Sequence, residues 1–161
     1  MSLSKVGGLA LIGGAGSALL LIAMIMGGVS PTDATAGRLL SVAMGLATAG
    51  CLLIAIRPPA DLAGRFPRLG LVLMGLGFLA VFLAGGEPAL IGLEGLGLGF
   101  ALVVVTLVRG PRRALGLVLG VGAVLVAFSW PIHAGGLFLV GDAIGGIGLV
   151  WLAVERVRAH A

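Results

Sequence analysis

Two acidic residues inside long apolar stretches, Glu94 and Asp142, have the side chains best suited to chemistry in this sequence. A carboxylate in hydrocarbon is costly unless it is paired, protonated or hydrated. No Lys or Arg lies within the apolar stretches, so neither acid has a basic partner at its own depth. Adjacent carboxylates repel, and at least one would then hold a proton near neutral pH. We expect such a pair to bind a proton, a cation or a cationic solute; alternatively, each acid is protonated and donates to a backbone carbonyl.

His133 is the third candidate ligand, because it follows Trp130 and Pro131 at the outer end of a predicted helix. It can act as an entrance ligand or proton relay, or it can simply be solvated in an interfacial loop. Two acids and one histidine are too few for a transition-metal site, and His160 lies at the opposite end of the predicted fold. We therefore expect no metal, no haem and no other cofactor.

Catalytic motifs are absent, since the sequence contains no GxSxG, HExxH, Walker lysine or CxxC. The hydroxyl residues Ser17, Ser41, Thr48 and Thr106 have no base nearby in sequence. They are better explained as donors to backbone carbonyls of their own helices. We predict no catalytic residue, and an enzyme is the least favoured class.

The composition requires a bilayer as part of the solvent. Of 161 residues, 60% are hydrophobic and 10% are charged, whereas soluble domains are about 45–50% apolar and about 25% charged. So few charges cannot cover a water-facing surface. The net charge of +4 does not indicate nucleic acid as a partner, because nine of the ten basic residues lie on one predicted side of the membrane.

Six apolar windows divide the chain, and each holds roughly 18 or more residues, enough to cross a hydrocarbon core of about 30 Å. They cover residues 6–32, 39–56, 69–86, 88–108, 114–132 and 134–154, with Glu94 in the fourth and Asp142 in the sixth. A signal peptide is the alternative for the first window, but it needs an apolar stretch of only about 7–15 residues. We predict a retained helix and an all-α fold, a single transmembrane domain over residues 1–161.

Basic residues alternate between the two sides of the predicted bundle. One side carries Lys5, Arg57, Arg65, Arg68, Arg109, Arg112, Arg113, Arg156 and Arg158, and the other carries Arg38. Cytoplasmic loops have the excess of Lys and Arg, so both termini are predicted to be cytoplasmic. We expect a bacterial or archaeal cytoplasmic membrane. The seven prolines agree with these loops, since each lies in or beside a connection.

Thirty glycines predict close packing of the helices, because small residues let membrane helices approach each other. GxxxG pairs occur in the last three windows, as Gly95 with Gly99, Gly116 with Gly120, and Gly141 with Gly145. We expect these pairs to pack within the chain. A contact face for a homo-oligomer or a larger membrane complex is the alternative.

A weak hairpin repeat relates the third and fourth windows to the fifth and sixth. Residues 69–73 and 115–119 share the sequence LGLVL, and Glu94 and Asp142 lie 48 residues apart. Sequence rich in Leu, Gly and Val also gives such matches by chance.

The function predicted first is transport or permeation by a small integral membrane protein. Its outward-facing acidic site would contain Glu94, Asp142 and His133. The alternative is a non-catalytic structural or assembly subunit of a larger membrane complex, which needs only packing surfaces. The lipid bilayer is a partner in both cases. If Glu94 and Asp142 lie apart or face outward in the structure, the subunit role is favoured over transport.

Overall fold

The computed structural model describes residues 3–30, 33–83, 87–129 and 135–158, and over these residues the fold is all-α with no strand. The helices are α1 (Leu3–Met26), α2 (Ala34–Ile56), α3 (Arg65–Leu83), α4 (Glu87–Arg109), α5 (Arg113–Ser129) and α6 (Gly135–Arg158). A short 3-10 turn, η1 (Ala60–Leu62), joins α2 to α3. The prediction of an all-α chain with six helices is confirmed.

A glycine turn ends α1 before its apolar window does. The helix stops at Met26, although uncharged residues continue to position 32. Gly28 has a φ of 93°, its N–H donates to the carbonyl of Ile25, and the N–H of Val29 donates to the carbonyl of Met24. This is a Schellman arrangement, which favours glycine because the left-handed backbone has no room for a Cβ.

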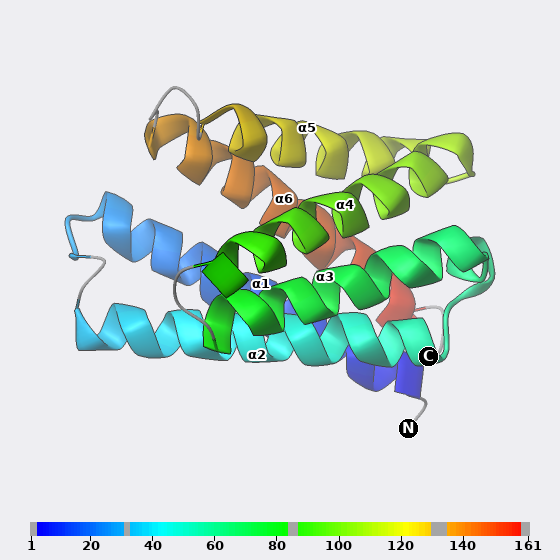
Figure 1. Cartoon of the computed structure of the whole chain (residues 1–161), viewed down its shortest axis with the longest axis horizontal. Helices are drawn as coiled ribbons and strands as arrows, with labels where there is room; N and C mark the ends of the chain where they lie inside the picture. The colour runs from blue at the N-terminus through cyan, green and yellow to red at the C-terminus, as the bar shows by residue number, and fades with distance from the viewer. Residues whose placement is uncertain (1–2, 31–32, 84–86, 130–134, 159–161) are drawn as a thin grey trace.

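The six helices form a ring in which each helix packs against its neighbours in sequence (Figure 1). Over the described residues, the packed pairs are α1–α2, α2–α3, α3–α4, α4–α5 and α5–α6, and α6 closes the ring against α1. The two termini lie at the same end of the molecule (Figure 1). α4 and α6 are not among the closely packed pairs, because α5 lies against both of them.

The largest buried side chains lie toward the end of the bundle that carries the termini, and all six helices contribute to them. They are Leu11, Cys51, Ile54, Leu62, Leu71, Met74, Leu107, Leu115, Leu119 and Leu152. Each helical member is within about three turns of the helix end on that side. In the other half of the described fold, small residues such as Ala36 and Ala43 take buried positions. Bulky side chains therefore fill the core mainly at one end.

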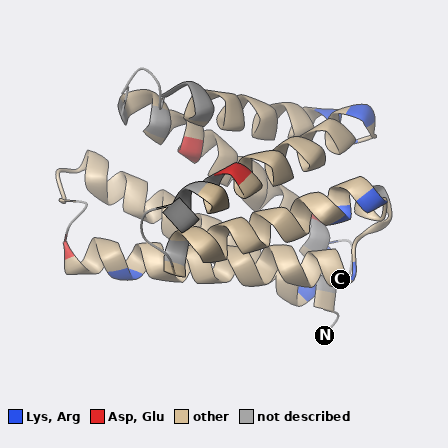
Figure 2. Ribbon diagram, viewed as in Figure 1, with Lys and Arg blue, Asp and Glu red and all other residues tan. Residues whose placement is uncertain are grey.

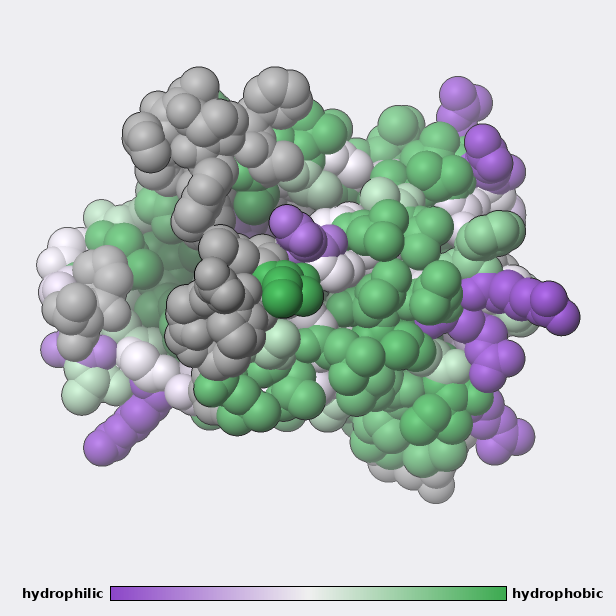
Figure 3. Space-filling model, in the orientation of Figure 1, coloured by the Kyte–Doolittle hydropathy of each residue, from purple (hydrophilic) through white to green (hydrophobic). Residues whose placement is uncertain are grey.

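Lys and Arg gather toward the ends of the helices, and mainly apolar side chains cover the visible face between them (Figures 2 and 3). Figure 2 shows Lys and Arg concentrated at the end that carries the termini, while Arg38 lies toward the other end of α2. Every helix exposes large apolar side chains, among them Leu20, Leu40, Leu76, Ile91, Leu117 and Ile147. The exterior is thus apolar along the helices and polar at their ends.

Two helices are long and apolar enough to cross a membrane, over Lys5–Met26 and Ala34–Ile56. Only 22% of the first apolar window and 39% of the second are buried inside the fold. A core helix of a soluble protein would bury most of its apolar surface. Over their described residues, α3 to α6 do not meet the same criteria of length and hydropathy.

Glycines spaced seven residues apart set the helix separation in the hairpin of α3 and α4. Gly70 and Gly77 of α3 lie opposite Gly99 and Gly92 of α4. A Cβ added to Gly99 would lie 2.5 Å from the carbonyl oxygen of Gly70, and one added to Gly77 would lie 2.6 Å from that of Gly92. Two backbones can approach this closely only where both side chains are absent. A seven-residue spacing is typical of left-handed helix pairs.

The other two hairpins use the same seven-residue spacing. In α1, Cβ atoms added to Gly7 and Gly14 would lie 3.2 Å from the carbonyl oxygen of Gly50 and 3.0 Å from that of Ala43. In α6, Gly141 and Gly148 both face α5. In each hairpin, glycines two turns apart therefore lie at the contact between the two helices.

The GxxxG pairs contribute unequally to the interfaces. The backbone of Gly145 does lie against α5, since a Cβ added to Gly122 would lie 2.6 Å from the N atom of Gly145, but neither Gly95 nor Gly145 excludes a side chain of its own. A Cβ on Gly95 would meet nothing closer than 3.9 Å, and one on Gly145 would meet nothing within 4 Å. Gly99 and Gly141 do pack against backbone atoms of the facing helix. The four-residue motif thus marks the correct helices, while the positions in α4 and α6 that exclude a side chain, Gly92 with Gly99 and Gly141 with Gly148, are seven residues apart.

The two LGLVL segments have different packing roles. Gly70, in the first, faces α4 within its own hairpin, whereas Gly116, in the second, faces Val108 of the preceding hairpin. The sequence match therefore does not correspond to equivalent contacts.

Substituting Gly99 with Ala should lower the free energy of unfolding by about 1–3 kcal/mol, because the new methyl group forces α3 and α4 apart. Gly97→Ala is the matched control on the same helix, since a Cβ there meets nothing within 4 Å. We expect the control to be unchanged or slightly more stable, because alanine favours the helix. Thermal unfolding in detergent measures both. Equal melting temperatures for the two variants would contradict the packing described here.

Candidate functional site

Glu94 and Asp142 lie at the same height on their helices. Each is seven residues after the first residue of its helix, which is Glu87 in α4 and Gly135 in α6. Seven residues of α-helix correspond to about 10 Å. Both acids therefore lie in the half of the fold away from the termini, as the sequence indicated.

Asp142 faces the interior of the ring. Its side chain is half-buried. Leu149 and Ala153 follow it by seven and eleven residues, so they lie on the same face of α6. Leu149 packs against the core, and Ala153 is fully buried. The carboxyl group thus lies on the inward face of α6, above the bulky core.

Glu94 faces outward. Its side chain is exposed, and so are those of Leu98, Ala101 and Val105, which follow it by four, seven and eleven residues on the same face of α4. The interior face of α4 carries Val103 and Leu107 instead, both of which are buried. This differs from the expectation that both acids face the interior. The reason is the rotation of α4. Because Gly92 and Gly99 face α3, Glu94 lies on the outer side of the helix.

The proposed acid pair remains a prediction. No hydrogen bond or ion pair joins Glu94 to Asp142 in the described part of the chain, and their helices are separated by α5. His133 lies outside the described residues. Over residues 3–30, 33–83, 87–129 and 135–158, no three His, Cys, Asp or Glu side chains come together as a metal site would require.

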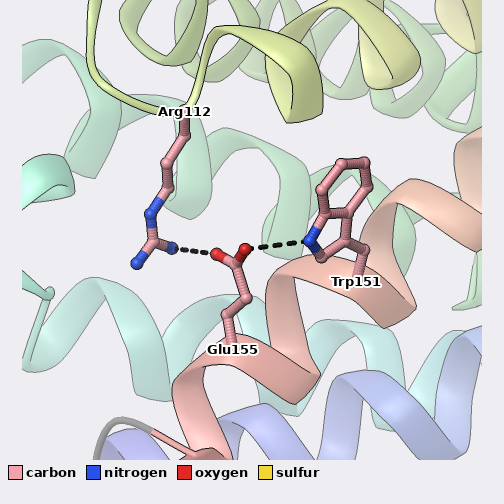
Figure 4. A network of polar contacts seen from close by, with 3 residues as sticks. All are labelled: Arg112, Trp151 and Glu155. Atoms are coloured by element: carbon pink, nitrogen blue, oxygen red, sulfur yellow. Dashed lines mark hydrogen bonds and ion pairs between the residues drawn. The ribbon is translucent and has the colours of Figure 1, made fainter.

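A polar network that the sequence analysis did not identify ties the α4–α5 connection to α6 (Figure 4). Nη1 of Arg112 lies 2.9 Å from Oε2 of Glu155. The indole Nε1 of Trp151 donates to the other carboxylate oxygen, Oε1 of Glu155, at 2.8 Å. The side chains of Arg112 and Glu155 are 25% and 34% exposed, while the two atoms of the ion pair are shielded from solvent.

The geometry of this network indicates a structural role. Both carboxylate oxygens of Glu155 are engaged, which leaves the group little capacity to bind a further ligand. Trp151 and Glu155 are four residues apart on one helix, and this spacing predicts that their side chains can contact each other. Arg112 could not be assigned from sequence, because its loop reaches α6 only through the packing of α5 on α6.

Comparison with protein-family models, with curated proteins and with solved structures finds no match to this chain. Functional inference therefore depends on the residues and the geometry described above.

The coupling between Arg112 and Glu155 should be measurable in a double-mutant cycle. With Arg112→Gln and Glu155→Gln, we expect a coupling free energy of about 0.5–1 kcal/mol, because the pair is partly exposed. Arg113→Gln combined with Glu155→Gln is the matched control and should show none. Unfolding of the detergent-solubilised variants gives these values. A coupling no larger than that of the control would show that the ion pair does not hold the loop.

Proposed function

We propose that this chain is an integral membrane protein with six transmembrane helices and both termini in the cytoplasm. The observation that carries the proposal is the apolar exterior, to which each helix contributes large exposed side chains. A water-soluble monomer rarely exposes a contiguous apolar patch larger than a few hundred Å². In a bilayer the same surface is favourable, because lipid tails replace water.

The helix lengths and the charge distribution support this topology. Over the described residues, α5 has 17 residues, and α1 and α6 have 24 each. At 1.5 Å per residue these lengths span about 25–36 Å, close to the hydrocarbon core of about 30 Å. The basic end of the molecule carries both termini (Figure 2), which is the orientation that the positive-inside rule favours.

Cysteine labelling tests the topology directly. In a Cys51→Ala background, Pro111→Cys lies in the exposed α4–α5 connection, and Thr35→Cys is exposed at the opposite end. In intact cells, a membrane-impermeant maleimide should label position 35 and spare position 111 until the cells are opened. Labelling at position 111 in intact cells would contradict the proposed orientation.

Within the membrane, we propose that the protein acts as a non-catalytic subunit of a larger membrane assembly. Glu94 supports this role, because its carboxyl group is exposed on an apolar face of α4. A carboxylate that faces lipid at this depth is costly, so such groups are normally covered by protein or paired. A partner helix that offers a hydrogen-bond donor or a cation to Glu94 would remove that cost. Gly97, one turn away, leaves open space beside the acid for such a helix.

Photocrosslinking from the outer face of α4 tests the subunit role. A photoreactive amino acid at Ile91 or Leu98, which flank Glu94, should give a discrete protein adduct in the native membrane. Replacing Glu94 with Ala should reduce that adduct severalfold. The matched control is Leu117, which is exposed on α5 and should give no adduct. An absence of protein adducts at positions 91 and 98, or adducts that do not depend on Glu94, would overturn the assembly role.

Transport is the second candidate, and the inward position of Asp142 favours it. The carboxyl group lies above the bulky core, in the half of the fold where most of the buried residues are small. A single interior acid can bind a proton or a cation without Glu94. Substitutions at Asp142 and at Glu94 can therefore distinguish transport from the subunit role.

Flux measurements on the purified chain in proteoliposomes distinguish the two candidates. A subunit without transport activity should give proton and monovalent cation fluxes no greater than those of empty liposomes. Flux that falls at least tenfold in Asp142→Asn, and persists in Glu94→Gln, would establish transport in place of the subunit role.

A further inference from the structure

A surface groove lies between the cytoplasmic ends of α2 and α3. It has a volume of about 420 Å³ and is lined by Leu52, Ala55, Ile56, Arg68, Leu69 and Val72. Five of these six residues are apolar, and Ile56 and Leu69 are largely exposed. The groove is thus an apolar surface hollow with one cationic residue in its wall.

Arg68 is held across the boundary between the two helices. Its Nε donates to the carbonyl oxygen of Ala55 at 3.2 Å. Ala55 lies in the last turn of α2, where carbonyl groups have no partner within the helix and the helix dipole favours a cation. This hydrogen bond fixes the position of Nε in the guanidinium group. Among the described residues, the two Nη atoms make no hydrogen bond or ion pair.

We propose that this groove binds an anionic phospholipid of the cytoplasmic leaflet, with its phosphate on the guanidinium of Arg68 and an acyl chain along Leu52, Leu69 and Val72. The inference rests on the proposed membrane topology, which puts this end of α2 and α3 at the cytoplasmic interface. It does not depend on either role proposed for Glu94 and Asp142.

Charge and shape both favour a phospholipid over another occupant. The Nη atoms form a planar pair of donors, which matches the oxygens of a phosphate. Arg57 at the end of α2 and Arg65 at the start of α3 are also exposed at this end, so the local field favours an anionic headgroup. The apolar wall would be left in water by a free phosphate ion, whereas an acyl chain covers it.

Native mass spectrometry of the full chain in detergent tests the site. Titration with phosphatidylglycerol should show one lipid bound more tightly than the rest, and phosphatidylcholine should bind at least severalfold more weakly. Arg68→Gln should weaken phosphatidylglycerol binding about fivefold, corresponding to about 1 kcal/mol for one arginine near the membrane surface. Arg113→Gln is the matched control, because Arg113 is exposed at the same end but does not line the groove. It should bind the lipid as the unmodified chain does.

A second variant keeps the test valid if Arg68→Gln disturbs the fold. Val72→Phe fills the groove and retains Arg68, so it should also weaken binding of the lipid. Inorganic phosphate at millimolar concentration should not displace the lipid. Equal losses in Arg68→Gln and Arg113→Gln, no loss in Val72→Phe, or displacement by phosphate would overturn the proposed site. Because cysteine labelling reports the topology independently, failure here would leave the six-span proposal intact.

Discussion

Close contact between helix backbones is the interaction on which the rest of this structure depends. In the α3–α4 hairpin, the backbone at Gly70 lies against that at Gly99, and the backbone at Gly77 lies against that at Gly92. Equivalent contacts occur at Gly14 in the first hairpin and at Gly141 in the third. In the proposed membrane setting there is little hydrophobic driving force between helices, so association would rely on such close packing. The seven-residue spacing also fixes the rotation of each helix, and hence which residues face inward.

The rotation set by glycine explains where the acids and the core lie. Once Gly92 and Gly99 face α3, Glu94 must lie on the outer side of α4. In α6, Gly141 faces α5 and the next residue, Asp142, turns toward the interior. Two acids at the same height therefore have different surroundings. We therefore propose different roles for them, contact with a protein partner for the outward acid and ion or proton binding for the inward acid.

Much of the fold could be predicted from sequence, because apolar windows and basic loops are properties of single segments. All six helices were located, and the end of α1 was misplaced only because Gly27 and Gly28 form a turn inside an uncharged stretch. Helix rotation was not predictable in the same way. Glycine occurs at spacings of both four and seven in α4, and only the position of the facing helix decides which spacing is used. The outward orientation of Glu94 was not predicted for that reason, while Arg112 was missed because its partner Glu155 is distant in sequence.

Nitroxide scanning of α5 in liposomes tests the six-span membrane fold most directly. α5 has 17 residues in the described part of the chain and is not one of the two helices that meet the criteria for a span there. Leu117, Val121 and Val124 are exposed on its outer face. With a spin label at each position in turn, we predict high collision rates with oxygen and low rates with a water-soluble nickel complex at all three. High accessibility to the nickel complex at these positions would show that α5 faces water and would contradict the six-span fold.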